Sequence, residues 1–198
     1  MNIILALVIG YILGSIPFAL VIGKVFYKTD VRKFGSGNLG GSNAGRVLGK
    51  KVGVAVTIMD AIKCIIAMGI MFLVDPSCIL YAGFGAAIGH CYPMFANFKG
   101  GKAVATIMGY VLGLVLFGLV PWYVFFLPLA SFFAILKVCK FVSFSSICMI
   151  FIAFVLALLS SSTTTALSIF VLWCFCTYRH RSNIDRLRKG TETKITWM

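Results

Sequence analysis

The sequence predicts an all-α integral membrane protein with seven transmembrane helices, and three observations support this prediction. The chain of 198 residues is 61% hydrophobic, and its mean hydropathy of +1.03 excludes an ordinary soluble domain. Its apolar runs approach the roughly 20 residues that a helix needs to cross a bilayer. Most Lys and Arg residues lie between these runs and form no separate polar domain. We therefore expect one membrane-embedded domain over residues 1–198.

Apolar segments predict the positions of the spans. The first span covers roughly residues 3–26 and contains Pro17, which frees a backbone carbonyl and is either a tolerated kink or a functional bend. The other spans are expected, in order, at about residues 52–74, at 78–95, at two short stretches within 103–138 that break near Pro121, at 144–159 and at 166–178.

The positive charges predict the orientation of these spans. The segments after spans 1, 3, 5 and 7 contain nearly all the loop cations, whereas those after spans 2, 4 and 6 contain none. Because cytoplasmic loops are enriched in Lys and Arg, the N-terminus is expected outside and the C-terminus in the cytoplasm. The net charge of +13 then reflects topology and attraction to anionic lipids or substrates. We expect no nucleic acid as a partner.

The longest polar stretch before the C-terminus, Gly35 to Lys51, has the composition of an anion-binding loop. It contains six glycines, two serines, two asparagines and Arg46, but no carboxylate. Glycines allow backbone N–H groups to turn toward one point, and hydroxyls, amides and a guanidinium add donors for a phosphate. It is not a nucleotide P-loop, because Lys51 follows Gly49-Lys50 where that motif needs Ser or Thr. A flexible basic loop that only fixes topology is an equally good interpretation of this stretch alone.

A second glycine-rich segment opens the helix after span 3. In Gly100-Gly101-Lys102, backbone N–H groups and an ammonium could together stabilise an anion at a helix N-terminus. A lysine that only sets topology is the alternative.

Ionisable residues also occur inside the predicted spans. Asp60 and Lys63 lie near the middle of span 2, three residues apart and therefore on one helix face. Such residues are costly in a membrane and are functional candidates by default. Because each charge already has a partner, a buried ion pair that only joins helices is the favoured interpretation. For His90, near the end of span 3, a buried core histidine is favoured.

A hydroxyl cluster follows the basic segment before span 6. Ser143, Ser145 and Ser146 lie at the start of that span. They either donate to a phosphate or simply cap the helix.

The polar tail from Arg179 to Met198 contains a further candidate pair. His180 and Asn183 are three residues apart and face one way on a helix, and Gly190 is expected to end that helix. His180 and Asp185 also match an H-x-x-x-x-D pattern. Because five residues place two side chains about 140° apart on a helix, we take that match as chance.

These four polar segments share the expected cytoplasmic side and a scarcity of acids. The chain has only five Asp and Glu residues, so no carboxylate cluster for a divalent metal is visible. We expect neither a metal nor another cofactor. Fixed cationic and hydroxyl donors suit substrates that already carry phosphate, and acyl transfer from a phosphate leaving group fits this donor set.

The segments GSGNLGGSNAGRVLGKK, GHCYPMFANFKGGKAVAT, VSFSSI and HRSNIDRLRKGTETKI resemble the successive motifs of the PlsY family, and the early SIPF and the D-x-x-K of span 2 fit as well. The resemblance extends over essentially the whole chain. It implies an acyl-phosphate:glycerol-3-phosphate acyltransferase of the bacterial inner membrane, active at the cytoplasmic face. Such an enzyme transfers a fatty acyl group from acyl phosphate, not acyl-CoA, to the 1-hydroxyl of glycerol 3-phosphate. The products are lysophosphatidic acid and phosphate, and an upstream acyl-phosphate-forming acyltransferase is the expected functional partner.

The resemblance also implies site residues. The catalytic candidates are His180, Asn183, Lys102 and Ser36. The candidate phosphate-binding residues are Ser36, Gly37, Asn38, Ser42, Asn43, Arg46, Gly100, Gly101, Lys102, Ser143, His180 and Asn183. His180 is either a general base or only a binding residue, since a phosphate oxygen of a substrate could accept the proton instead.

Two positions depart from the family pattern. Ala103 follows Gly-Gly-Lys where the family commonly has glycine, and Gly41-Ser42-Asn43 stands where it commonly has Ala-Thr-Asn. The alanine puts a side chain at a turn where glycine would let the backbone approach a ligand closely.

Transport of an organic phosphate is the alternative function, because it would use the same cations. Transporter sites usually lie near the membrane midplane between repeats. Here most polar groups are expected at one face, and the sequence has no internal repeat. A purely structural membrane subunit would explain the spans but not four polar segments on one side.

Overall fold

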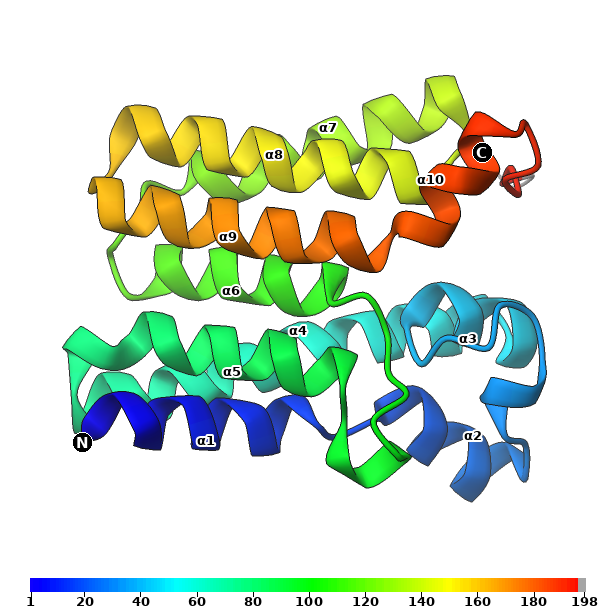
Figure 1. Ribbon diagram of the computed structural model, residues 1–198, viewed down its shortest axis with the longest axis horizontal. Coiled ribbons are helices and arrows are strands. Elements are labelled where there is room, and N and C mark those ends of the chain that lie inside the picture. The colour runs from blue at the N-terminus through cyan, green and yellow to red at the C-terminus, as the bar shows by residue number, and fades with distance from the viewer. Residues whose placement is uncertain (196–198) are drawn as a thin grey trace. The chain divides into compact units, whose positions relative to one another are not determined.

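The computed structural model describes residues 1–195. All regular secondary structure in this range is helical, and it contains no strand. The chain packs as two compact units, the first ending at Gly113 and the second starting at Leu114 (Figure 1). The single domain expected from the sequence stays a prediction. The last three residues of the predicted tail lie outside the described residues.

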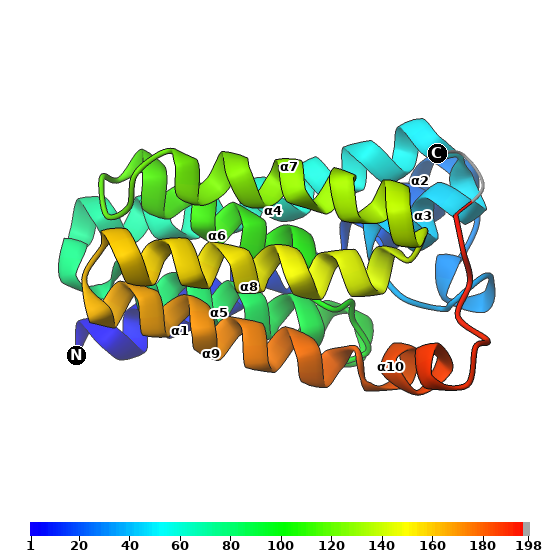
Figure 2. The same cartoon turned by 90° about the horizontal axis from the view of Figure 1, so that it is seen from above.

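Helices α1, α4 and α5 form the centre of the first unit, lying side by side in Figures 1 and 2. Helix α6 joins them, because a Cβ added at Gly109 would collide with the backbone of Ala61 on α4, and the buried Tyr110 lies against Gly83 of α5. The elements of this unit are α1 (Asn2–Gly14), α2 (Phe18–Tyr27), η1 (Val31–Lys33), α3 (Gly41–Leu48), α4 (Lys50–Val74), η2 (Pro76–Cys78), α5 (Ile79–Cys91), η3 (Met94–Ala96) and most of α6 (Val104–Leu116).

Small residues bring α1 and α5 into close contact. A Cβ added at Gly14 would collide with the carbonyl of Ala86, and one added at Gly85 would collide with the carbonyl of Leu7. Membrane helices gain little from apolar burial against each other, so such close backbone packing is a main source of their association.

The predicted first span is interrupted. Helix α1 ends at Gly14 and α2 begins at Phe18, with Pro17 as the N-cap residue. Proline lacks an N–H group and restricts the residue before it, so the helix stops and restarts here.

The glycine-rich stretch is more ordered than the sequence predicted. The expected loop reached Lys51, but residues 41–48 form α3. Its apolar face contributes to a small core that also contains Leu20 of α2 and Val56 of α4. The three-residue spacing of Ala44 and Val47 is helical, but the surrounding glycines concealed it.

The second unit contains α7 (Tyr123–Cys139), α8 (Val142–Ser160), α9 (Thr163–Arg179) and α10 (Arg181–Arg188). Helix α8 packs against both α7 and α9, as Figures 1 and 2 show. The Ser162 hydroxyl accepts a hydrogen bond from the N–H of Thr165 and caps α9. Helix α10 ends before Gly190, which has a φ of +69°. That end confirms the predicted stop.

Four helical segments have the length and apolar composition to cross a membrane. They are the segments Asn2–Tyr27, Lys50–Val74, Pro76–Ala96 and Val142–Ser160. Helices α6 and α7 are apolar but shorter, as predicted for the region around Pro121.

The contact between α1 and α5 supports a stability test. Gly85→Val should lower the free energy of unfolding by about 1–3 kcal/mol, because the added side chain separates the two backbones. Thermal melting in detergent measures the effect. Val54→Leu adds bulk at an exposed position of α4 and is the matched control. Equal melting temperatures for Gly85→Val and the wild type would contradict this packing.

Candidate functional site

Asn43 holds the glycine-rich loop together from inside. Its side chain is only 1% exposed. The amide nitrogen donates to the carbonyl oxygens of Val31 at 2.9 Å and Phe34 at 3.3 Å, and the amide oxygen accepts the N–H of Ser36 at 2.8 Å. Gly35 turns beside it with a φ of +60°, and an added Cβ there would collide with the amide oxygen. Asn43 is thus engaged within the loop, so its contact with a ligand would be secondary to this role.

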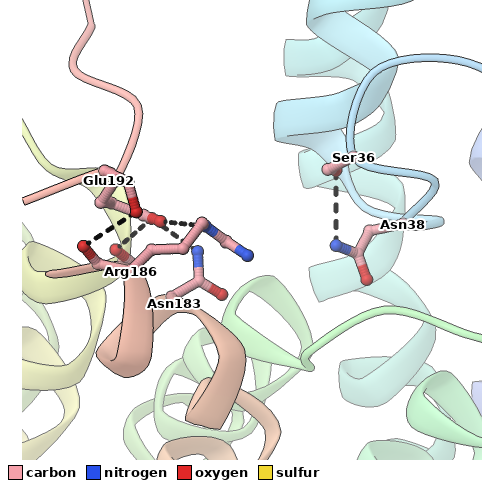
Figure 3. A network of polar contacts seen from close by, with 7 residues as sticks. Ser36, Asn38, Asn183, Arg186 and Glu192 are labelled. Atoms are coloured by element: carbon pink, nitrogen blue, oxygen red, sulfur yellow. Dashed lines mark hydrogen bonds and ion pairs between the residues drawn. The ribbon is translucent and has the colours of Figure 1, made fainter. Parts of the chain in front are cut away.

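The outward-facing donors of this loop are hydroxyls, an amide and a guanidinium. Ser36 is exposed; its hydroxyl donates to the amide oxygen of Asn43 at 3.2 Å and accepts a long 3.4 Å hydrogen bond from Asn38 (Figure 3). Ser42 and Arg46 are exposed, and four residues apart they share one face of α3. Gly37, with a φ of +70°, completes the turn.

The carboxylate that precedes this loop in the chain is already paired. Asp30 binds Arg32 through both oxygens, with a shortest distance of 2.6 Å. The hydrogen bond from Arg32 lowers the pKa of Asp30 to about 2. Its charge is therefore balanced locally, which weakens repulsion of an anion at the loop.

The backbone N–H groups of the second glycine-rich segment, which we predicted to face an anion, bond to the protein itself. The N–H of Gly100 donates to the carbonyl of Cys91 at 3.2 Å, and that of Gly101 to the carbonyl of His90 at 3.1 Å. An added Cβ at either glycine would collide with His90. These N–H groups bond the end of α5 and do not face an anion. Lys102, half-buried, comes directly after them.

Ala103 adopts an unfavourable backbone conformation. Its φ is +62° and it is fully buried. This left-handed conformation costs an L-residue roughly 1–2 kcal/mol, whereas glycine adopts it freely. The turn thus favours the glycine that the family resemblance led us to expect here.

Three ionisable side chains form one buried network in the first unit. The ammonium of Lys63 lies 2.7 Å from a carboxylate oxygen of Asp60, 3.0 Å from the carbonyl oxygen of Ile16 and 3.1 Å from Nδ1 of His90. The predicted ion pair and buried histidine are confirmed. Their connection to each other and to the break at Pro17 was missed, because no local pattern links these positions.

Glu192 organises the candidate residues of the second unit. One of its oxygens accepts hydrogen bonds from Ser143 at 2.7 Å and Asn183 at 2.6 Å, and the other accepts one from Arg186 at 2.7 Å (Figure 3). Burial opposes the charged form of Glu192, but the hydrogen bonds from Asn183, Ser143 and Arg186 outweigh it and lower its pKa. The sequence indicated Ser143 and Asn183 as candidates but missed Glu192.

His180 lies at the junction of α9 and α10 and is 3% exposed. Its Nδ1 lies 2.8 Å from the carbonyl oxygen of Cys176. Because a carbonyl can only accept, we assign the ring proton to Nδ1, which makes Nε2 an acceptor. Asp185 is exposed, as expected if the H-x-x-x-x-D match arose by chance. The N–H of Asn183 donates to the backbone carbonyl of His180 at 2.8 Å, so both belong to one turn.

The neighbouring serines do not cap α8. The hydroxyls of Ser145 and Ser146 donate to the carbonyls of Phe141 and Val142, four residues earlier. The capping alternative is therefore wrong for both residues.

Within residues 1–195, no group of three or more His, Cys, Asp and Glu side chains is arranged to hold a metal ion. The expectation of a reaction without metal stays a prediction.

A family model described as glycerol-3-phosphate acyltransferase matches residues 4–190. The chain belongs to the glycerol-3-phosphate acyltransferase family. The glycerol-3-phosphate acyltransferase of Listeria welshimeri is 43% identical over 100% of this chain and 98% of its own length. That of Macrococcus caseolyticus is 42% identical over 98% of both chains. The resemblance to this family noted from the motifs is thereby confirmed.

Two crystal structures share the fold of this acyltransferase. They are the glycerol 3-phosphate and lysophosphatidic acid forms of PlsY (YgiH), an integral membrane glycerol 3-phosphate acyltransferase. Their TM-scores are 0.90 and 0.88 at 32% identity, and each match covers 99% of this chain and 96% of that chain. With its apolar helices, the chain is a multi-pass membrane acyltransferase.

The conformation of Ala103 makes the turn a target for stabilisation. Ala103→Gly should raise the free energy of unfolding by up to about 1 kcal/mol, because strain is relieved while backbone entropy offsets part of the gain. Thermal melting measures this gain. Ala87→Gly, in the interior of α5, is the control and should lower stability. A lower melting temperature for Ala103→Gly would contradict the strain.

The environment of Glu192 predicts a pH-dependent contribution to stability. A lowered pKa means that the stabilisation is present above the ordinary value of 4.5 and is lost as the pH falls through the folded-state pKa. Glu192→Gln should therefore cost about 2 kcal/mol near pH 7, and the difference from the wild type should shrink toward pH 3. Melting curves across this range provide the measurement. A difference independent of pH would contradict a charged Glu192.

Proposed function

We propose that this acyltransferase transfers a fatty acyl group from acyl phosphate to the 1-hydroxyl of glycerol 3-phosphate, giving lysophosphatidic acid and phosphate. The observation that carries the proposal is the full-length similarity to a structure solved in glycerol 3-phosphate and lysophosphatidic acid forms. The donor is inferred from the four motifs and from the abundance of cations over acids. A phosphate leaving group needs neutralisation, which fixed Arg, Lys, Ser and Asn donors supply.

The first unit is proposed to bind phosphate. Ser36 and Asn38 lie on the loop that Asn43 holds, and Arg46 lies on α3. Lys102 follows the turn bonded to α5. Arg46 offers a planar fork of donors and Lys102 a point charge, so the two suit different oxygens of a phosphate.

The second unit is proposed to bind and orient glycerol 3-phosphate. With Nδ1 held by Cys176, Nε2 of His180 can accept a hydrogen bond from a substrate hydroxyl. Asn183 and Ser143 are fixed by Glu192. Pre-organised groups of this kind lower the entropic cost of bringing the two substrates together.

In the reaction, the 1-hydroxyl oxygen attacks the acyl carbon, and the bond from that carbon to the phosphate oxygen breaks. The electron pair of that bond leaves with phosphate. The hydroxyl proton moves to a phosphate oxygen, or to Nε2 of His180 as general base. Because acyl phosphate is a mixed anhydride, a strong base is not required.

Lys and Arg placement supports the topology that we propose. It has seven spans in the bacterial inner membrane, with the N-terminus outside and the C-terminus and the active site in the cytoplasm. Helices α6, α7 and α9 supply the spans beyond the four long segments. An enzyme that forms acyl phosphate would provide the donor.

The donor is tested with purified protein in lipid, EDTA, labelled glycerol 3-phosphate and either palmitoyl phosphate or palmitoyl-CoA. Lysophosphatidic acid from palmitoyl phosphate alone is expected. Product only from the CoA ester would overturn the donor assignment. No product from either, together with phosphate uptake into liposomes, would favour transport.

The phosphate-binding role is tested at Lys102. Lys102→Ala should lower kcat/KM for glycerol 3-phosphate about 100-fold or more, because a transition-state charge loses a fixed donor. Lys137→Ala removes an exposed cation outside the proposed site and should retain activity. Near-normal activity of Lys102→Ala in the same assay would remove Lys102 from the site.

A further inference from the structure

The buried network of Asp60, Lys63 and His90 lies directly beneath the turn that carries Lys102. The three side chains are only 1%, 3% and 6% exposed. The backbone of the turn bonds the end of α5, through the N–H of Gly101 and the carbonyl of His90 at 3.1 Å. A Cβ added at Gly101 would collide with Nε2 of the His90 ring. The ring and the turn therefore have no room to shift independently.

The network fixes the orientation of the His90 ring. Nδ1 of His90 lies 3.1 Å from the ammonium of Lys63 and 3.4 Å from a carboxylate oxygen of Asp60, so both charged side chains of α4 hold the ring. Asp60 holds the ammonium at 2.7 Å, and the carbonyl of Ile16 anchors it to the break between α1 and α2. Helices α4 and α5 and the break between α1 and α2 thus determine where Nε2 of His90 meets the turn.

The turn itself needs external support. Asn97, Phe98 and Ala103 all have positive φ values, of +55°, +56° and +62°. Strained residues of this kind persist only where their surroundings determine the backbone. The hydrogen bonds from the N–H groups of Gly100 and Gly101 to carbonyls of α5 fix the backbone of the turn. The His90 ring packs behind these hydrogen bonds.

Stability alone is a weak reason for such a network. Buried ion pairs lose about as much on leaving water as they gain from attraction, and well-packed apolar residues often replace them without loss. Their best-supported use is to specify one arrangement among several. In this protein, the arrangement that they would specify is that of the turn before Lys102.

We propose that Asp60, Lys63 and His90 are positioning residues that fix Lys102 by holding the Gly100-Gly101 turn against the end of α5. The inference rests on the proposed function, because it assumes that Lys102 binds phosphate. None of the three side chains touches substrate in this account. Losing these side chains would displace the Lys102 ammonium. A displacement of about 1 Å in a catalytic site can lower turnover about 100-fold.

The test replaces the whole network by apolar residues of similar size, in the variant Asp60→Leu/Lys63→Met/His90→Leu. Replacing all three avoids leaving one charge buried without a partner. The melting temperature should fall by a few degrees, because the carbonyl of Ile16 loses its hydrogen bond from Lys63, but kcat/KM of the folded variant for glycerol 3-phosphate should fall at least about 10-fold. Asp75→Asn is the control, since it removes an exposed carboxylate bonded to Asn2 in the same unit. A folded triple variant with wild-type kcat/KM would overturn the proposal.

A second variant keeps the proposal falsifiable if the triple variant does not fold. Gly101→Ala leaves every charge in place but forces the ring and the turn apart. It should also lower kcat/KM at least about 10-fold, and unchanged kcat/KM would overturn the proposal. Lys102→Ala is measured alongside. Near-normal activity there refutes the phosphate role of Lys102, whereas an inactive Lys102→Ala with a fully active triple variant refutes the positioning role alone.

Discussion

A polar group surrounded by hydrocarbon must find its partner within the protein, and this requirement decides where the chain can depart from helical geometry. The break at Pro17 shows the rule. It leaves the carbonyl of Ile16 outside any helix, and the ammonium of Lys63 bonds it. The charge of Lys63 then needs Asp60. One interruption of a helix thus requires a buried ion pair on its neighbour.

The same rule shapes both groups of candidate site residues. In the first unit, the loop carbonyls of Val31 and Phe34 are satisfied by the buried amide of Asn43. In the second, the carboxylate of Glu192 accepts hydrogen bonds from Ser143 and Asn183. In the first unit a buried amide holds an exposed loop in place, and in the second a carboxylate holds two buried donors. Such fixed donors suit phosphate chemistry, because they need not reorganise when charge develops.

The sequence predicted features that depend on local composition. Apolar length located the helices, and Gly190 located the end of α10 because a glycine there can take a positive φ. The four motifs indicated the family, which the full-length comparison confirms. Helix α3 was missed, because its glycines obscured its apolar face. That face is recognisable only from its packing against α2 and α4.

What the sequence could not provide is long-range pairing. Glu192 meets Ser143 across 49 positions, and Lys63 meets His90 across 27. The amides of Gly100 and Gly101 show the same limit, since a Gly-Gly-Lys sequence predicts donors but not which acceptor they bond. Here the acceptors are carbonyls of α5. Periodicity describes one helix at a time, and these contacts join different helices.

The central claim is that phosphate is bound by side chains that buried partners hold in place. A crystal structure of this acyltransferase with phosphate, the proposed leaving group, tests it most directly. We expect phosphate oxygens within hydrogen-bond distance of Arg46 or Lys102, with Asn43 still bonded to Val31 and the amides of Gly100 and Gly101 still bonded to α5. A phosphate bound away from both cations, or directly on those two glycine amides, would contradict the account.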